Sequence, residues 1–134
     1  MELDYDVWSA NRNESVTKTI SPSDINLVIE RLTALNQKEY TQLVLGASDG
    51  HLMIGGGLGA YVCTYTQGEQ EAYFNLINPN VAPEDEADEI EVVTGGQAGT
   101  FPPAIVIDRQ LAEQAIQYFV KNEQMDPSLI WEED

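Results

Sequence analysis

The sequence predicts an α+β fold: a mostly antiparallel sheet, a meander of about four to six strands, with two main helices packed on it. Two segments repeat apolar residues at helical spacing, and each follows a capping residue. Between them, short apolar runs are separated by Gly, Asn and Asp, as is typical of antiparallel strands. With 134 residues, 43% of them apolar, the chain is expected to form a single domain over residues 1–134.

The first strand and the first helix are predicted near the start of the chain. Apolar residues alternate there with Asp4 and Asp6, so we expect a short strand whose acidic face meets solvent. Ser21 can cap a helix that begins with Pro22, and Asp24 can close a capping box. We expect this helix to continue to about residue 35. Its apolar side contains Ile25, Val28, Ile29, Leu32 and Leu35.

Four consecutive strands are predicted in the middle of the chain. Residues 41–47 and 51–55 are strand-like and are joined by a turn at 48–50, where Asp-Gly favours the positive φ angles of a tight hairpin. A second strand pair, 60–66 and 71–77, is separated by a short polar turn. Because successive strands with short turns pair with each other, these four runs predict an antiparallel meander.

The remaining elements are an acidic loop, further extended segments and a second helix. Residues 83–91 are expected to form a loop that leads into a strand at 90–94, and residues 104–107 are expected to be extended. Asp108 is placed to cap the second helix, and Lys121 lies near its negative end. The apolar side of this helix contains Leu111, Ala115, Ile116 and Phe119.

The charge balance excludes the usual nucleic-acid-binding and membrane-binding classes. The chain has 23 acidic and 6 basic residues, a formal net charge of −17. Such a surface repels phosphate backbones and anionic lipids, so we expect no direct nucleic-acid partner and no membrane contact. The first residues carry no basic-then-apolar leader, and no run approaches the ~20 apolar residues of a membrane helix. We therefore expect a cytoplasmic protein.

Few residues suggest catalysis or metal binding. Cys63 is the only cysteine, so no internal disulfide can form, and its apolar neighbours indicate burial as a small hydrophobe. His51 is the only histidine, and no serine motif or metal-ligand spacing accompanies it. The run Gly55–Gly59 is followed by a strand pattern and not by the helix that a phosphate loop requires, which favours a flexible or bulged link. We expect no cofactor, no metal and no enzymatic activity.

One acidic cluster is the candidate partner-binding site. It lacks the ligand order of a calcium-binding hand, so calcium binding is the least favoured of three interpretations. The other two are a solvated loop without specific role and a contact surface for a basic partner. We call it the acidic segment. Its members are Glu84, Asp85, Glu86, Asp88, Glu89 and Glu91.

The C-terminal half resembles a known family. The run Phe101-Pro102-Pro103-Ala104-Ile105-Val106-Ile107, the helix at 111–120 and the ending Pro127-Ser128-Leu129-Ile130-Trp131-Glu132-Glu133 resemble the bacterial immunity proteins encoded beside deaminase toxins in polymorphic toxin systems. An early Trp8, a capped first helix, a strand pair and the glycine-rich connector are similar to that family's layout. The likeness covers residues 8–133.

The resemblance implies a function that agrees with the charge. It implies a non-enzymatic immunity protein that binds a cognate toxin and occludes its active site. The toxin is expected to be a nucleic-acid deaminase, with a nuclease as the less favoured class. A toxin that acts on nucleic acid has a basic substrate groove, to which a protein of charge −17 is attracted. The residues leave two alternatives open, an acidic interaction or regulatory module with another basic partner and a small carboxylate-dependent enzyme. They leave the oligomeric state open as well.

Overall fold

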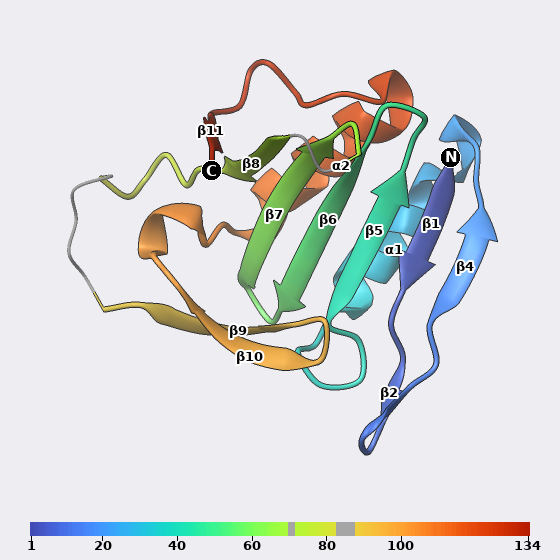
Figure 1. The fold of residues 1–134 in the computed structure, drawn as a ribbon, viewed down its shortest axis with the longest axis horizontal. Helices are drawn as coiled ribbons and strands as arrows, with labels where there is room; N and C mark the ends of the chain where they lie inside the picture. The colour runs from blue at the N-terminus through green and yellow to red at the C-terminus, as the bar shows by residue number, and fades with distance from the viewer. Residues whose placement is uncertain (70–71, 83–87) are drawn as a thin grey trace.

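The structure, a computed structural model, describes residues 1–69, 72–82 and 88–134 and shows a large antiparallel sheet with two helices (Figure 1). The sheet strands are β1 (Glu2–Tyr5), β4 (Val16–Thr19), β5 (Gln42–Gly46), β6 (Gly50–Gly57), β7 (Ala60–Gln67), β8 (Ala72–Leu76) and β11 (Trp131–Glu133). Their order is β11-β8-β7-β6-β5-β1-β4, and every neighbouring pair is antiparallel. The predicted α+β class is confirmed, and β5 to β8 form the predicted meander.

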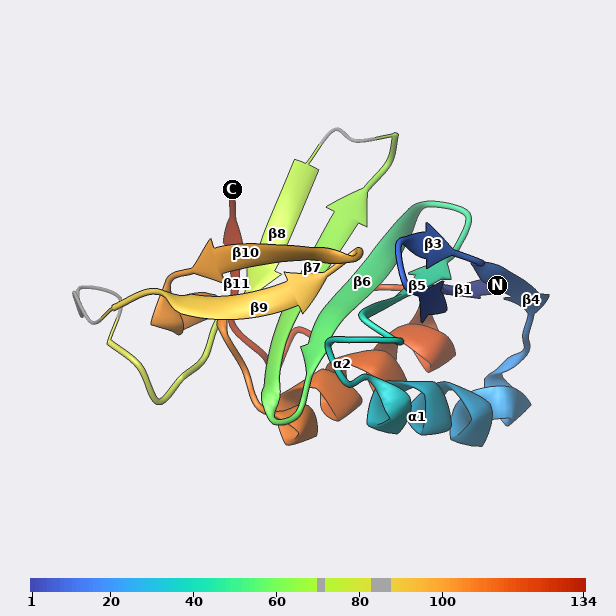
Figure 2. The ribbon, with the colours of Figure 1, turned by 90° about the horizontal axis from the view of Figure 1, so that it is seen from below.

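The two helices are α1 (Ile25–Ala34) and α2 (Arg109–Asn122), and they lie side by side on one face of the sheet (Figure 2). The predicted start signals are present in both. The Asp24 carboxylate accepts the backbone N–H of Ser21 at 2.9 Å before α1, where a 3-10 turn precedes the helix. Asp108 Oδ1 accepts the N–H of Leu111 at 2.9 Å at the start of α2. Neither described helix has the length and apolar character needed to cross a membrane.

The main core lies between these helices and the sheet. Leucine and isoleucine side chains from alternate positions of the central strands point toward the helices, which is the expected result of a period of two. Cys63 belongs to this core with 2% of its surface exposed, as predicted. The largest fully buried side chains are Phe119, Leu3, Leu32, Leu43, Leu45, Leu52, Ile54, Leu76, Ile107 and Ile116.

Two small hairpins lie outside the main sheet. Strands β9 (Ile90–Thr94) and β10 (Gln97–Phe101) form a hairpin on the sheet face opposite the helices, across the ends of β6 and β7 (Figure 2). Strands β2 (Trp8–Ser9) and β3 (Arg12–Asn13) form the other. Val62 and Val92 meet in a second, smaller core under the first hairpin.

The strands that the sequence did not predict are short or polar. β4, β10 and β11 are each confined to three to five residues with little apolar alternation, so their pairing depends on the strand beside them. Residues 104–107 are not a strand, which corrects that prediction: Pro103–Ile105 form a 3-10 turn, because proline fits a first helical position. Only Ile107 pairs, through two backbone hydrogen bonds with Tyr61 of 2.8 and 3.0 Å.

The glycine-rich run is also different from its prediction. Gly55, Gly56 and Gly57 are buried residues within β6, and only Leu58 and Gly59 form the turn to β7, with φ of 57° and 88°. The three glycines are therefore part of the sheet rather than a link between strands. Their lack of a side chain serves close packing against a neighbouring element, as described next.

Candidate functional site

The acidic segment leads into the β9–β10 hairpin. Glu84, Asp85 and Glu86 lie outside the described residues. Asp88 and Glu89 are exposed directly before β9, and Glu91 is exposed on β9 opposite Thr100. The described members of the acidic segment thus stand together at the start of one strand, with their carboxylates in contact with solvent.

Close packing on glycine holds this hairpin on the sheet. Val92 is completely buried, and one of its methyl groups would lie 3.0 Å from a β-carbon placed on Gly56. Thr94 lies over Gly55 so closely that a β-carbon there would overlap with its side chain. The glycines of β6 therefore allow the hairpin to approach the sheet, a role that sequence spacing alone does not reveal.

A buried carboxylate organises the other end of the hairpin. Asp6 is 3% exposed and accepts hydrogen bonds from the backbone N–H groups of Thr41 (2.7 Å) and Gln42 (3.0 Å), the Thr41 hydroxyl and Trp8 Nε1 (2.7 Å). Thr41 Oγ1 in turn accepts the N–H of Gly96, in the β9–β10 turn, at 2.9 Å. The sequence placed Asp6 on a solvent-exposed face, and this expectation is wrong because the chain beyond β1 hydrogen-bonds to residues 39–42, whose N–H groups enclose the carboxylate together with Trp8.

A glutamine completes the attachment of the hairpin. Gln37 Nε2 donates to the carbonyl of Gly57 at 2.8 Å, and Gln37 Oε1 accepts the N–H of Val93 at 2.9 Å. The side-chain amide therefore joins the end of β6 to the middle of β9. With the contacts above, β9 is held on the sheet from Val92 to Thr94, directly after the described residues of the acidic segment.

The acidic residues have few cationic neighbours within the molecule. Among the described residues only two ion pairs occur, Arg12–Glu14 at 3.9 Å and Arg109–Glu113 at 3.8 Å, and both are partly exposed. Arg31 lies instead against two tyrosine rings, 3.9 and 4.7 Å from their centroids. Surface pairs of this kind neutralise little charge. The negative charge of the described surface is therefore available to a basic partner.

The sheet face beside the hairpin is a second candidate surface for a partner. It faces the viewer in Figure 1, with the helices behind it. One row of paired residues crosses six strands on this face. Each residue of the row is half-buried or exposed, and the row contains acidic, polar and apolar side chains. The row consists of Glu132, Asn75, Thr64, Met53, Val44 and Asp4.

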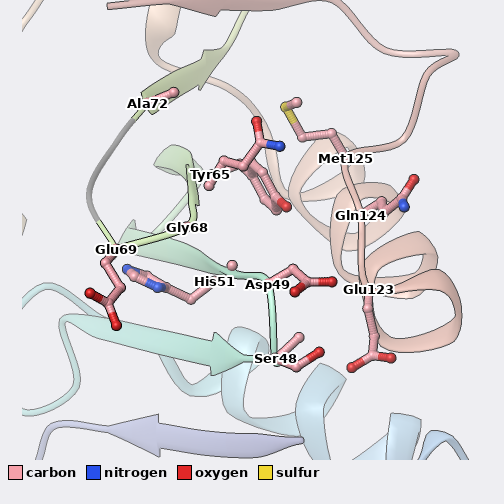
Figure 3. A pocket seen from close by; sticks show the side chains of 13 residues that line it. Ser48, Asp49, His51, Tyr65, Gly68, Glu69, Ala72, Glu123, Gln124 and Met125 are labelled. Atoms are coloured by element: carbon pink, nitrogen blue, oxygen red, sulfur yellow. The ribbon is translucent and has the colours of Figure 1, made fainter.

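A pocket lies at one end of the sheet, where the β5–β6 turn and the end of β7 meet the residues after α2 (Figure 3). It has a volume of about 860 Å³ and is open to solvent. His51 lines it and is half-buried, which places the single histidine at the surface. The other residue singled out for its chemistry, Cys63, is enclosed in the core, and burial raises the pKa of its thiol. No cluster of three metal-binding side chains occurs among the described residues.

Comparison with known proteins gives one match. A family model described as immunity protein Imm1 matches residues 13–133. The matched region includes both helices, the meander, the β9–β10 hairpin and the C-terminal strand. A search of curated proteins finds no match for this chain.

Proposed function

This chain belongs to the immunity protein Imm1 family, and we propose that it protects the cell that makes it by binding a cognate toxin and occluding the toxin's active site. The family match over residues 13–133 confirms the resemblance to bacterial immunity proteins and supports a role in toxin immunity. Such a protein acts in the compartment where the toxin would act, which for a nucleic-acid-modifying toxin is the cytoplasm.

The charge of the surface is the observation that carries the choice of target. A toxin that modifies nucleic acid needs a basic groove for the phosphate backbone. The net charge of −17, with only two partly exposed ion pairs among the described residues, suits such a groove. We therefore assign the toxin to the nucleic-acid deaminases, as the family resemblance implies, with a nuclease as the alternative that the test below distinguishes.

The inhibition needs no chemical step by this protein. The acidic segment attracts the basic groove and raises the association rate, because long-range charge acts mainly on diffusional encounter. Apolar contacts at the centre of the interface then slow dissociation. Val44 and Met53 on the uncovered sheet face are available for that purpose. The bound protein then keeps nucleic acid out of the toxin's groove, because it fills the groove and because its negative charge repels the phosphate backbone.

The first experiment tests immunity itself. The toxin domain encoded by the adjacent reading frame is purified with and without this protein and incubated with single- and double-stranded nucleic acid. We expect a stable complex, base deamination by free toxin and its loss at one equivalent of this protein. Strand cleavage by free toxin would replace the deaminase assignment with a nuclease. If no complex forms, or if the complex remains fully active, the proposed function is wrong.

The second experiment tests the acidic segment. The variant D88N/E89Q/E91Q removes three charges from its described part, and E14Q/E30Q/E39Q removes three exposed charges elsewhere. Association with the toxin is measured by stopped flow between low and high salt. We expect the segment variant to associate about tenfold more slowly at low salt, with an unchanged dissociation rate. The control variant should remain within about twofold. Equal slowing of both variants would show that only total charge matters and would exclude the acidic segment as the contact.

A further inference from the structure

The pocket at the end of the sheet is lined by acidic groups from three separate parts of the chain. Asp49 comes from the β5–β6 turn, Glu69 from the turn after β7, and Glu123 is the residue after α2 (Figure 3). No lysine or arginine is among the described residues that line the pocket. Neither of the two described ion pairs involves these three acids, so their charges are not neutralised by the described residues.

The C-terminus of α2 adds further negative potential. Glu123 adopts the left-handed conformation, with φ of 57°, and its N–H donates to the carbonyl of Phe119 at 2.7 Å. This turn directs Gln124 and Met125 along the wall of the pocket. The last carbonyl groups of a helix lack partners within it and form the negative end of its dipole, which favours a cation nearby.

A buried tyrosine provides an independent indication of a ligand. Tyr65 is 4% exposed, and its ring packs edge-on against Phe119 in the core, 6.1 Å between centroids. Its hydroxyl reaches the pocket beside Gly50, where a β-carbon would lie 2.7 Å from Tyr65 Oη. Among the described residues this hydroxyl makes no hydrogen bond, and its oxygen is not one of the fully buried polar atoms, so it is open to a group that enters the pocket. Burial, and then the charge of Asp49, raise the pKa of Tyr65, so the hydroxyl keeps its proton.

The charge of the described lining residues indicates the chemistry of the pocket's occupant. Three acidic residues and the Tyr65 phenol line one cavity of about 860 Å³. A guanidinium group carries five N–H donors in a plane and a charge that persists at every physiological pH. An ammonium group has only three N–H donors on a single nitrogen atom. It can therefore bond fewer acceptors than a guanidinium group when the acceptors belong to separate parts of the pocket.

We propose that this pocket receives an arginine side chain of the cognate toxin. The inference rests on the proposed function for the identity of the partner, but the pocket's affinity for a guanidinium group is a property of this chain alone. The acidic segment would then act on encounter, and the pocket would act after it by holding one side chain of the toxin in a fixed place.

The first test uses the isolated protein. Isotope-labelled protein at neutral pH is titrated with N-acetyl-arginine amide or with its uncharged isostere N-acetyl-citrulline amide. We expect the arginine compound to shift the amide resonances of Gly50, His51, Gly68 and Glu123 in a saturable way, with a Kd in the millimolar range. The citrulline compound should leave them unchanged.

Two variants locate the effect. D49N/E69Q/E123Q should bind the arginine compound about tenfold more weakly, whereas E14Q/E30Q/E39Q should bind as the parent protein does. Tyr65→Phe, which removes only the hydroxyl, should weaken binding by about twofold to fivefold. The proposal is overturned if no pocket resonance shifts, if citrulline is equivalent, or if the control variant loses as much affinity as the pocket variant.

The toxin complex provides the second test and separates the two proposals. The pocket variant should dissociate from the toxin about tenfold faster than the control variant, with a similar association rate. If arginine amide binds but toxin dissociation is unaffected, the pocket is a cation site that the toxin does not use, and the proposal is overturned while immunity stands. If the parent protein binds no toxin, the proposed function fails independently of the titration.

Discussion

Replacement of Gly55 by alanine should detach the β9–β10 hairpin from the sheet. The backbone of Gly55 has no positive φ, so alanine is compatible with its conformation, and the effect comes from space alone. The new β-carbon would lie closer than 3.0 Å to the Thr94 side chain, a separation that β-carbons do not show. The hairpin must therefore move away from β6.

The size of the loss follows from what the movement exposes. Val92 is fully buried beneath the hairpin, and its burial stabilises the fold by about 1.5–3 kcal/mol. The hydrogen bond from Gly96 N–H to Thr41 Oγ1 contributes about 1 kcal/mol more. Alanine restricts the unfolded chain, which offsets about 0.4–1 kcal/mol. We expect a net loss of about 2–3 kcal/mol.

Urea unfolding measures the total loss, and hydrogen exchange shows where it arises. The matched control is Gly46→Ala on β5, where the nearest atom to a new β-carbon is 4.0 Å away and no strain is expected. Gly46→Ala should change the unfolding free energy by less than about 1 kcal/mol. In G55A, amides of β9 and β10 should exchange faster than those of β7. An unfolding free energy within about 0.5 kcal/mol of the parent, with the hairpin still protected, would refute the explanation given for this glycine.

Two further predictions concern buried carboxylates. Asp6→Asn should lower the unfolding free energy by about 2–4 kcal/mol, because one amide oxygen cannot accept all four hydrogen bonds of the carboxylate. It should also change the fluorescence of Trp8, which donates one of them. An unchanged urea midpoint and emission maximum would contradict this. For Asp126, burial alone raises the pKa, but hydrogen bonds from Ser128 and Gln114 outweigh it and lower the pKa below its usual value. The resulting stabilisation is present at neutral pH and is lost as the pH falls through the folded-state pKa. Ser128→Ala should therefore cost about 1 kcal/mol at neutral pH, with a difference from the parent that shrinks in acid; a difference independent of pH would contradict the assignment.

Local sequence signals predicted the elements whose stability is mainly local. Asp108 and the Ser21-Pro22 start act on residues close in the sequence, so they could be recognised without the fold. The predicted hairpin does join β5 to β6, but its expected cause is wrong, because neither Asp49 nor Gly50 has a positive φ. Gly50 lies within β6, where a β-carbon would come within 2.6 Å of the Thr66 carbonyl oxygen. The apolar periodicity of α1 and α2 identified the sides that meet the sheet. The family resemblance, carried by short motifs in the second half of the chain, was likewise contained in the sequence and is confirmed by the family match.

Contacts between distant segments decided everything else. Asp6 is buried only because Thr41 and Gln42 donate to it from 35 and 36 residues away. Gly55 and Gly56 are explained only by the hairpin that crosses them, and β11 exists because β8 offers an open edge. The pocket combines Asp49, Tyr65 and Glu123, which no spacing in the sequence relates. Periodicity and capping report how a segment interacts with itself, whereas these features depend on which surfaces the folded chain brings together.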